Sequence, residues 1–106
     1  MDIEELLEEA RQKSTQFGQL VGHKEVADDK LKTTYALIRE EAPSGSVADM
    51  DAWVRRQPEY QAAIEEKRDA YAKYHAANLY MKILFAQIEV WRSKEATNRF
   101  IDKVHQ

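Results

Sequence analysis

The stretch Ala42-Pro43-Ser44-Gly45-Ser46 interrupts a chain that otherwise contains few residues that break helices. Proline disfavours helical geometry at the residue before it, so this stretch predicts a helix end followed by a loop. Ser46 and Asp49 have the spacing of a capping box, which predicts the start of a new helix. Pro58 ends that helix and suits the first turn of the next one. We therefore predict a helix over about 2–42, a loop over 43–46, a short helix over about 47–56 and a long helix over about 58–103.

The two long predicted helices each carry an apolar stripe. Before the loop, apolar residues recur at spacings of three and four from Ile3 to Ala42, as on one face of a helix. Gly18 and Gly22 each cost about 1 kcal/mol relative to alanine inside a helix. We expect one long helix here, and the sequence leaves open whether it bends or breaks near residues 18–24. Because a short connector joins the two long helices, we expect them to fold back as an antiparallel hairpin.

The predicted fold class is all-α, a long antiparallel helical hairpin with a short connecting helix. The 106 residues suffice for one domain, and three glycines and two prolines are too few for the frequent turns of an all-β sandwich or barrel. A two-helix hairpin buries only one stripe of each helix, so we expect a homodimer, as a four-helix bundle or coiled coil. The candidate face for the core or the dimer contact consists of Tyr60, Ile64, Tyr71, Tyr74, Met81, Phe85 and Ile88.

The sequence lacks the residues that several classes of function require. There is no cysteine, so disulfides, a thiolate zinc site and a cysteine nucleophile are excluded. No apolar run approaches the roughly 20 residues of a membrane span, and the acidic start is unlike a signal peptide, so we expect a cytoplasmic protein with no membrane partner. No phosphate-binding loop or catalytic motif occurs, and the three histidines lack the neighbours of a metal site. We expect no enzyme activity, no catalytic, metal-binding or cofactor-binding residues, and no cofactor.

Basic residues replace the apolar stripe near the end of the last predicted helix. At 100° per residue, Arg92, Arg99 and Lys103 continue the face that carries Ile88. In an antiparallel hairpin they could lie beside the acidic start of the chain and fix the helix register by pairing, which is the more usual role of charged helix faces. Alternatively, they could form a surface for phosphates or an acidic partner. The candidate residues for that partner or nucleic-acid surface are Trp91, Arg92, Lys94, Arg99 and Lys103.

Lys24 and Asp28 interrupt the apolar stripe of the first predicted helix. In a hairpin centred on residues 49–51, this polar layer would face about residues 72–77. A polar layer can fix the register of packed helices at a cost in stability. It could equally form a groove for a partner, and the sequence leaves both interpretations open.

Three short segments carry a resemblance to a known group of proteins. They are the small-residue turn Ser44-Gly45-Ser46-Val47-Ala48-Asp49, the segment Ile88-Glu89-Val90-Trp91-Arg92-Ser93 and the downstream pair Asn98-Arg99. With the acidic start and the Tyr/Ala-rich long helix, this layout is similar to small helical proteins of bacteriophages and prophages. Those proteins are often encoded beside single-strand annealing and recombination genes. The resemblance implies a setting in phage DNA metabolism, in the cytoplasm of a bacterial host, and it implies no mechanism.

Three functions are compatible with these observations. The first is a non-enzymatic, homodimeric helical module that assists or modulates phage DNA recombination or replication through contacts with a protein partner. The second is sequence-independent binding of single-stranded DNA by the basic end of the last helix, since aromatic and basic side chains together can bind bases and phosphates. The third, which ranks last, is inhibition of a host nuclease or defence complex by the acidic side chains Glu4, Glu5, Glu8 and Glu9.

Overall fold

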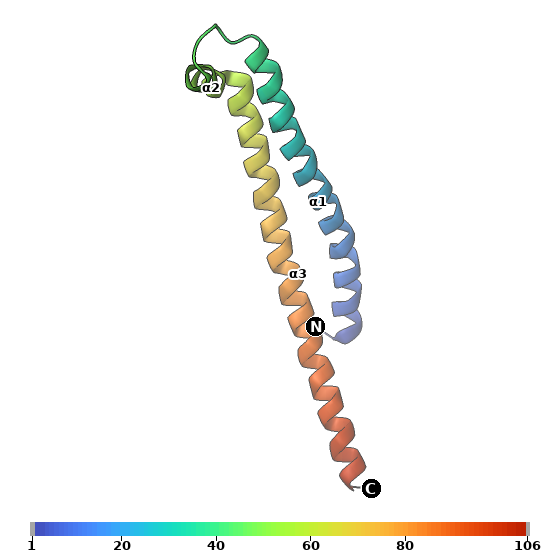
Figure 1. The fold of residues 1–106 in the computed structure, drawn as a ribbon. Coiled ribbons are helices and arrows are strands. Elements are labelled where there is room, and N and C mark those ends of the chain that lie inside the picture. Colours follow the sequence, from blue (N-terminus) through green and yellow to red (C-terminus); the bar gives the residue numbers. More distant parts are fainter. Residues whose placement is uncertain (1, 106) are drawn as a thin grey trace. The chain divides into compact units, whose positions relative to one another are not determined.

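The structure is a computed structural model that describes residues 2–105. These residues form three α-helices and no strand: α1 (Ile3–Glu40), α2 (Val47–Arg55) and α3 (Pro58–His105), shown in Figure 1. The prediction of an all-α helical hairpin is therefore confirmed. Helix α1 continues through Gly18 and Gly22 without ending there, and α3 extends two residues beyond its predicted end.

The chain divides into two compact units, each built from part of α1 and part of α3. One unit combines the residues up to Gly18 with those from Ala76 onward, and the other is Gln19–His75. We call them the open unit and the turn unit. Helix α2 and the loop before it belong to the turn unit.

Side chains satisfy the exposed backbone groups at the helix starts. Ser46 adopts extended backbone geometry, and its Oγ accepts a hydrogen bond from the Asp49 amide at 3.1 Å. Asp2 has the same role at α1, where its Oδ1 accepts from the Glu5 amide at 2.9 Å. The first amides of a helix have no partner within the helix, so such caps favour helix formation at these positions.

The core of the turn unit lies where α2 meets the two long helices. Val54 of α2 is fully buried and packs with Ile38 of α1 and Tyr60 of α3. The Tyr35 ring meets the Tyr60 ring edge-on, with 5.9 Å between centroids, while its hydroxyl donates to Asp51 Oδ1 at 2.6 Å. The short helix therefore covers the closed end of the hairpin and packs against an aromatic pair there.

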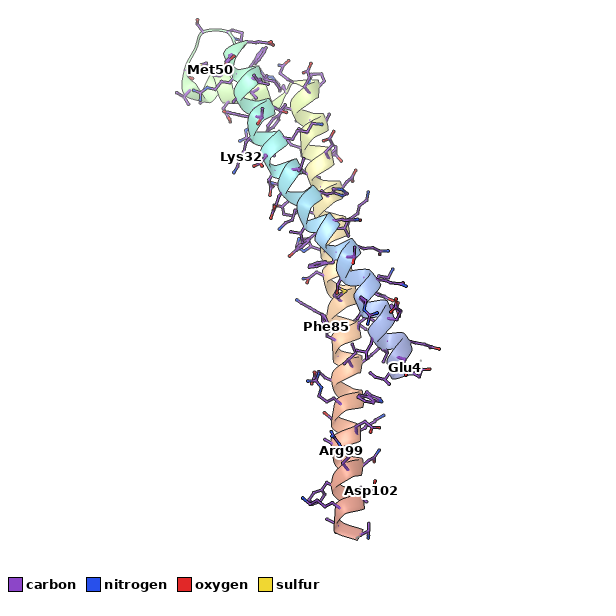
Figure 2. All side chains as sticks on the ribbon, turned by 90° about the vertical axis from the view of Figure 1, so that its right-hand side faces the viewer. Glu4, Lys32, Met50, Phe85, Arg99 and Asp102 are labelled. Carbon is purple, nitrogen blue, oxygen red and sulfur yellow. The ribbon has the colours of Figure 1, made fainter. Side chains whose placement is uncertain are left out.

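The core of the open unit joins the start of α1 to the middle of α3. Its buried members are Leu6, Ala10, Met81, Leu84 and Ile88, with Ile3 and Phe17 packed beside them. Because Ile88 already packs near the first turn of α1, the remainder of α3 extends past that turn. Figures 1 and 2 both show this extension, and Arg99 and Asp102 lie on it, well beyond Glu4.

Candidate interaction surfaces

The predicted polar layer is a connected group of side chains in the turn unit. The Tyr71 hydroxyl lies 2.7 and 2.9 Å from the two carboxylate oxygens of Asp28, to which it donates. Lys67 Nζ lies 3.3 Å from Asp28 Oδ1. Lys24 Nζ lies over the Tyr74 ring, 4.3 Å from its centroid. The structure thus brings Lys24 and Asp28 together with tyrosines of α3 and with Lys67, which the sequence analysis had not included.

The electrostatics of this layer follow from its hydrogen bonds. The Tyr71 hydroxyl, with a smaller contribution from Lys67, lowers the pKa of Asp28 below its ordinary value of 3.8. The same hydrogen bond raises the pKa of Tyr71 above 10.0, because losing its proton would place two negative charges together. The layer therefore favours a charged Asp28 beside a neutral Tyr71 over a wide range of pH.

The predicted core or dimer face is divided between buried and exposed positions. Tyr60, Met81 and Ile88 are buried within their own units, and Ile64, Tyr71 and Tyr74 are partly buried. Phe85 differs from these, because 53% of its surface is exposed. Most of this face is thus already covered, largely by α1.

The predicted basic surface lies on the part of α3 that extends past α1. Arg92, Lys94, Arg99 and Lys103 are exposed, as is Trp91. Arg92 pairs with Glu89 of the same helix at 3.1 Å, and Arg99 Nε lies 3.4 Å from the Glu95 carbonyl oxygen, to which it donates.

The basic side chains do not pair with the acidic start of α1. In the part of the chain that the structure describes, no ion pair joins the basic surface to Glu4, Glu5, Glu8 or Glu9. Instead, Glu8 pairs with Arg11 of α1, and Glu9 accepts a hydrogen bond from Tyr80. The register-fixing interpretation of the basic end therefore finds no support in these contacts. The physical reason is the extension of α3, which leaves the basic residues without α1 opposite them.

A surface that the sequence analysis missed runs along α3 in the open unit. Its large apolar side chains are exposed, and the exposed fraction is 61% for Leu79 and 67% for Phe100. We call this set the apolar row, and it consists of Leu79, Ile83, Val90, Phe100 and Val104. The signal in the sequence is a second apolar stripe at helical spacing, on a different face from the stripe that α1 covers.

The apolar row borders an open groove. The groove is lined by Ile83 and Val90 of the row, by Ala86 and Gln87 between them, and by Leu6 of α1. Its walls are thus predominantly apolar, as expected of a surface that binds another apolar element.

Within residues 2–105 the structure shows neither a metal-binding cluster nor a membrane-spanning helix. These residues contain no group of three or more His, Asp or Glu side chains placed to hold a metal ion. His75 instead lies against the rings of Tyr71 and Tyr74, with centroids 6.0 and 5.2 Å away. None of the described helices is both long and apolar enough to span a bilayer.

No protein-family model, curated protein or solved structure matches this chain. Its class is therefore defined by the fold and surfaces described above: an all-α helical hairpin with a basic surface and an exposed apolar row on its longest helix.

Proposed function

We propose that this protein is a non-enzymatic helical interaction module whose apolar row binds another protein chain. The observation that carries the proposal is the exposure of five large apolar side chains along one helix. Single exposed apolar residues are ordinary, but a row of them along one face of a helix marks an interaction site. Burying one such side chain fully contributes about 1.5–3 kcal/mol, so several together can drive association.

The proposed biological setting comes from the resemblance to small phage proteins. It places the module in the cytoplasm of a bacterial host, where, as a homodimer, it assists or modulates DNA recombination or replication through protein contacts. The resemblance alone supports this setting, whereas the apolar row supports the interaction itself.

Affinity capture with paired variants tests the proposal. The immobilised full chain would be incubated with an extract of the cells that carry the gene. Val90→Glu places a charge in the apolar row, and Phe85→Glu places the same charge at an equally exposed position outside it (55% and 53% exposed). We expect proteins that are retained by wild type and by Phe85→Glu to be lost from Val90→Glu. Identical retention by all three chains, with no effect of Val90→Glu on self-association, would contradict the proposal.

Single-stranded DNA binding is a second candidate function, favoured by the position of the basic surface. Lys94, Arg99 and Lys103 are exposed on the extension of α3, with Trp91 on the same helix. Lysine and arginine bind phosphates with release of counterions, and aromatic rings can stack on bases.

Fluorescence anisotropy with a labelled oligothymidylate tests this second candidate. We expect binding at low salt that weakens steeply as salt rises, and that is lost in Arg99→Glu/Lys103→Glu. The matched control is Lys32→Glu/Lys73→Glu, which makes the same change in net charge at two exposed lysines elsewhere. No binding at low salt, or equal loss in both double variants, would exclude a specific role for the basic surface.

A further inference from the structure

We infer that the apolar row is the seam of a parallel two-stranded coiled coil formed with a second copy of this chain. The inference rests on the proposed function, because it identifies the partner that occupies the proposed interaction surface. It differs from the dimer expected from the sequence, which used the face that α1 largely covers.

The residues of the apolar row have the spacing of a coiled-coil seam. Three small residues fill its gaps, and the eight positions then alternate in steps of four and three, the heptad pattern of a coiled coil. In chain order they are Leu79, Ile83, Ala86, Val90, Ser93, Thr97, Phe100 and Val104, and all are exposed. At about 1.5 Å per residue, this seam is about 38 Å long.

The side chains at the heptad positions also fit a coiled coil. The steps assign the a positions to Ile83, Val90, Thr97 and Val104, all of which are β-branched. The d positions begin with Leu79, followed by two small residues and Phe100. In parallel coiled coils, β-branched residues at a combined with leucine at d favour two strands over three or four. The a positions and Leu79 fit this pattern, so the row fits one further helix, and the charges beside the seam decide its direction.

Charged residues at the flanking positions, which set helix orientation in coiled coils, favour the parallel arrangement. In a parallel, in-register pair, Glu89 at g would face the second copy's Lys94 at e, and this attraction would occur twice. In the corresponding antiparallel pair, Lys82 would instead face the second copy's Lys103, and this repulsion would occur twice. Glu89 pairs in one chain with Arg92, but both side chains are more than 60% exposed, so Glu89 remains accessible to a second partner.

Helix α1 leaves the seam uncovered. At about 100° per residue, Val90 lies about 180° around α3 from Met81, which is buried in the core with α1. A second α3 can therefore pack on the seam without displacing α1. The basic stripe through Arg92 and Arg99 lies on the side of Met81, so it would remain exposed in the dimer.

Sedimentation equilibrium of two matched variants tests the seam. In Val90→Glu, two carboxylates would face each other at an a position, and we expect self-association to weaken at least about 100-fold. Phe85→Glu should keep the wild-type dimer, since Phe85 lies outside the seam. Helical circular dichroism would verify that both chains are folded. A wild-type chain that stays monomeric, or a dimer lost in Phe85→Glu and kept in Val90→Glu, would overturn the inference.

Disulfide cross-linking tests the parallel orientation, since the natural chain has no cysteine. Ala86→Cys and Thr97→Cys would be oxidised separately and then as a mixture. A parallel seam brings each introduced thiol opposite its own copy, so each variant alone should cross-link. An antiparallel seam puts position 86 opposite position 97, so cross-links would form chiefly in the mixture. That second result would overturn the parallel arrangement.

These experiments also separate the inference from the proposed function. If the wild-type chain is monomeric but captures a different protein that Val90→Glu cannot capture, the coiled-coil inference fails and the proposed function stands. If Val90→Glu changes neither self-association nor capture, both fail.

Discussion

The Tyr71 hydroxyl of α3 donates to both carboxylate oxygens of Asp28 of α1, at 2.7 and 2.9 Å. This contact fixes the position of a polar layer within an otherwise apolar stripe. An alternative register would leave the partly buried carboxylate without its donor, and an unsatisfied polar group is costly. The contact therefore specifies which turn of α1 packs against which turn of α3 in the turn unit.

The stabilising effect of this contact should depend on pH. The lowered pKa of Asp28 means that its contribution is present above 3.8 and is lost as the pH falls through the lowered value. The raised pKa of Tyr71 means that its contribution is present below 10.0 and is lost as the pH rises through the raised value. We predict that the Tm difference between wild type and Tyr71→Phe is largest near neutral pH and shrinks at both extremes. A Tm difference that stays constant from pH 2 to pH 7 would contradict this account.

The cap of α2 should contribute measurably to stability. Ser46 Oγ accepts a hydrogen bond from the Asp49 amide, so Ser46→Ala removes a partner that the helix itself cannot supply. We predict a loss of about 1 kcal/mol in the free energy of unfolding, measured by urea denaturation. Ser44→Ala, in the preceding loop, is the control and should cost much less. Equal losses in the two variants would show that the cap is not the cause.

The core of the open unit should be sensitive to truncation at Leu84. Only 3% of this side chain is exposed, and it packs with Leu6 and Ala10 of α1. Leu84→Ala removes buried apolar contacts and leaves a cavity, so we predict a loss of about 2–3 kcal/mol in the free energy of unfolding. The neighbouring exposed Phe85→Ala serves as the control. If both changes cost the same, the assignment of Leu84 to the core is wrong.

Replacing the glycines of α1 should stabilise the protein. A Cβ atom added at Gly18 or Gly22 would meet nothing within 4 Å, and both residues have negative φ within the helix. Alanine restricts the unfolded chain more than glycine does, so each substitution should add about 0.5–1 kcal/mol. Thermal denaturation of Gly18→Ala and Gly22→Ala measures the effect. Destabilisation by either would mean that the native protein requires glycine at that position.

Charge reversal in the basic surface should leave the fold intact. The polar contacts of Arg92 and Arg99 described above are exposed and remain within α3. Exposed pairs of this kind contribute little. We predict that Arg92→Glu/Arg99→Glu changes Tm by no more than a few degrees. A large drop in Tm would indicate that these residues pair with the acidic start of α1 after all.

Local signals in the sequence predicted the helices and the polar layer. The Pro43 and Pro58 breaks and the Ser46 cap act over a few residues, so their effects can be predicted without the fold. Lys24 and Asp28 were recognised because they interrupt an apolar stripe. Tyr74, the partner of Lys24, lies within the expected range of 72–77, whereas Tyr71 and Lys67, the partners of Asp28, lie before it. The sequence did not identify these partners, because the position of a residue on a stripe does not specify which side chains of the facing helix reach it.

The open end of the molecule was harder to predict. Helix α1 has 38 residues and α3 has 48, so part of α3 has no α1 beside it, and the basic residues fall there. The apolar row was not predicted, because α3 carries two apolar stripes and only the stripe through Met81 and Ile88 was recognised. Spacing identifies both stripes, but only the packing of α1 shows which stripe stays exposed.

Light scattering behind size exclusion, on the wild-type full chain over a range of concentrations, tests whether a second copy of the chain covers the apolar row of α3. A second copy on the row predicts a mass of twice the 12.4 kDa of one chain, approached as the concentration rises. A mass of one chain at every concentration would contradict it.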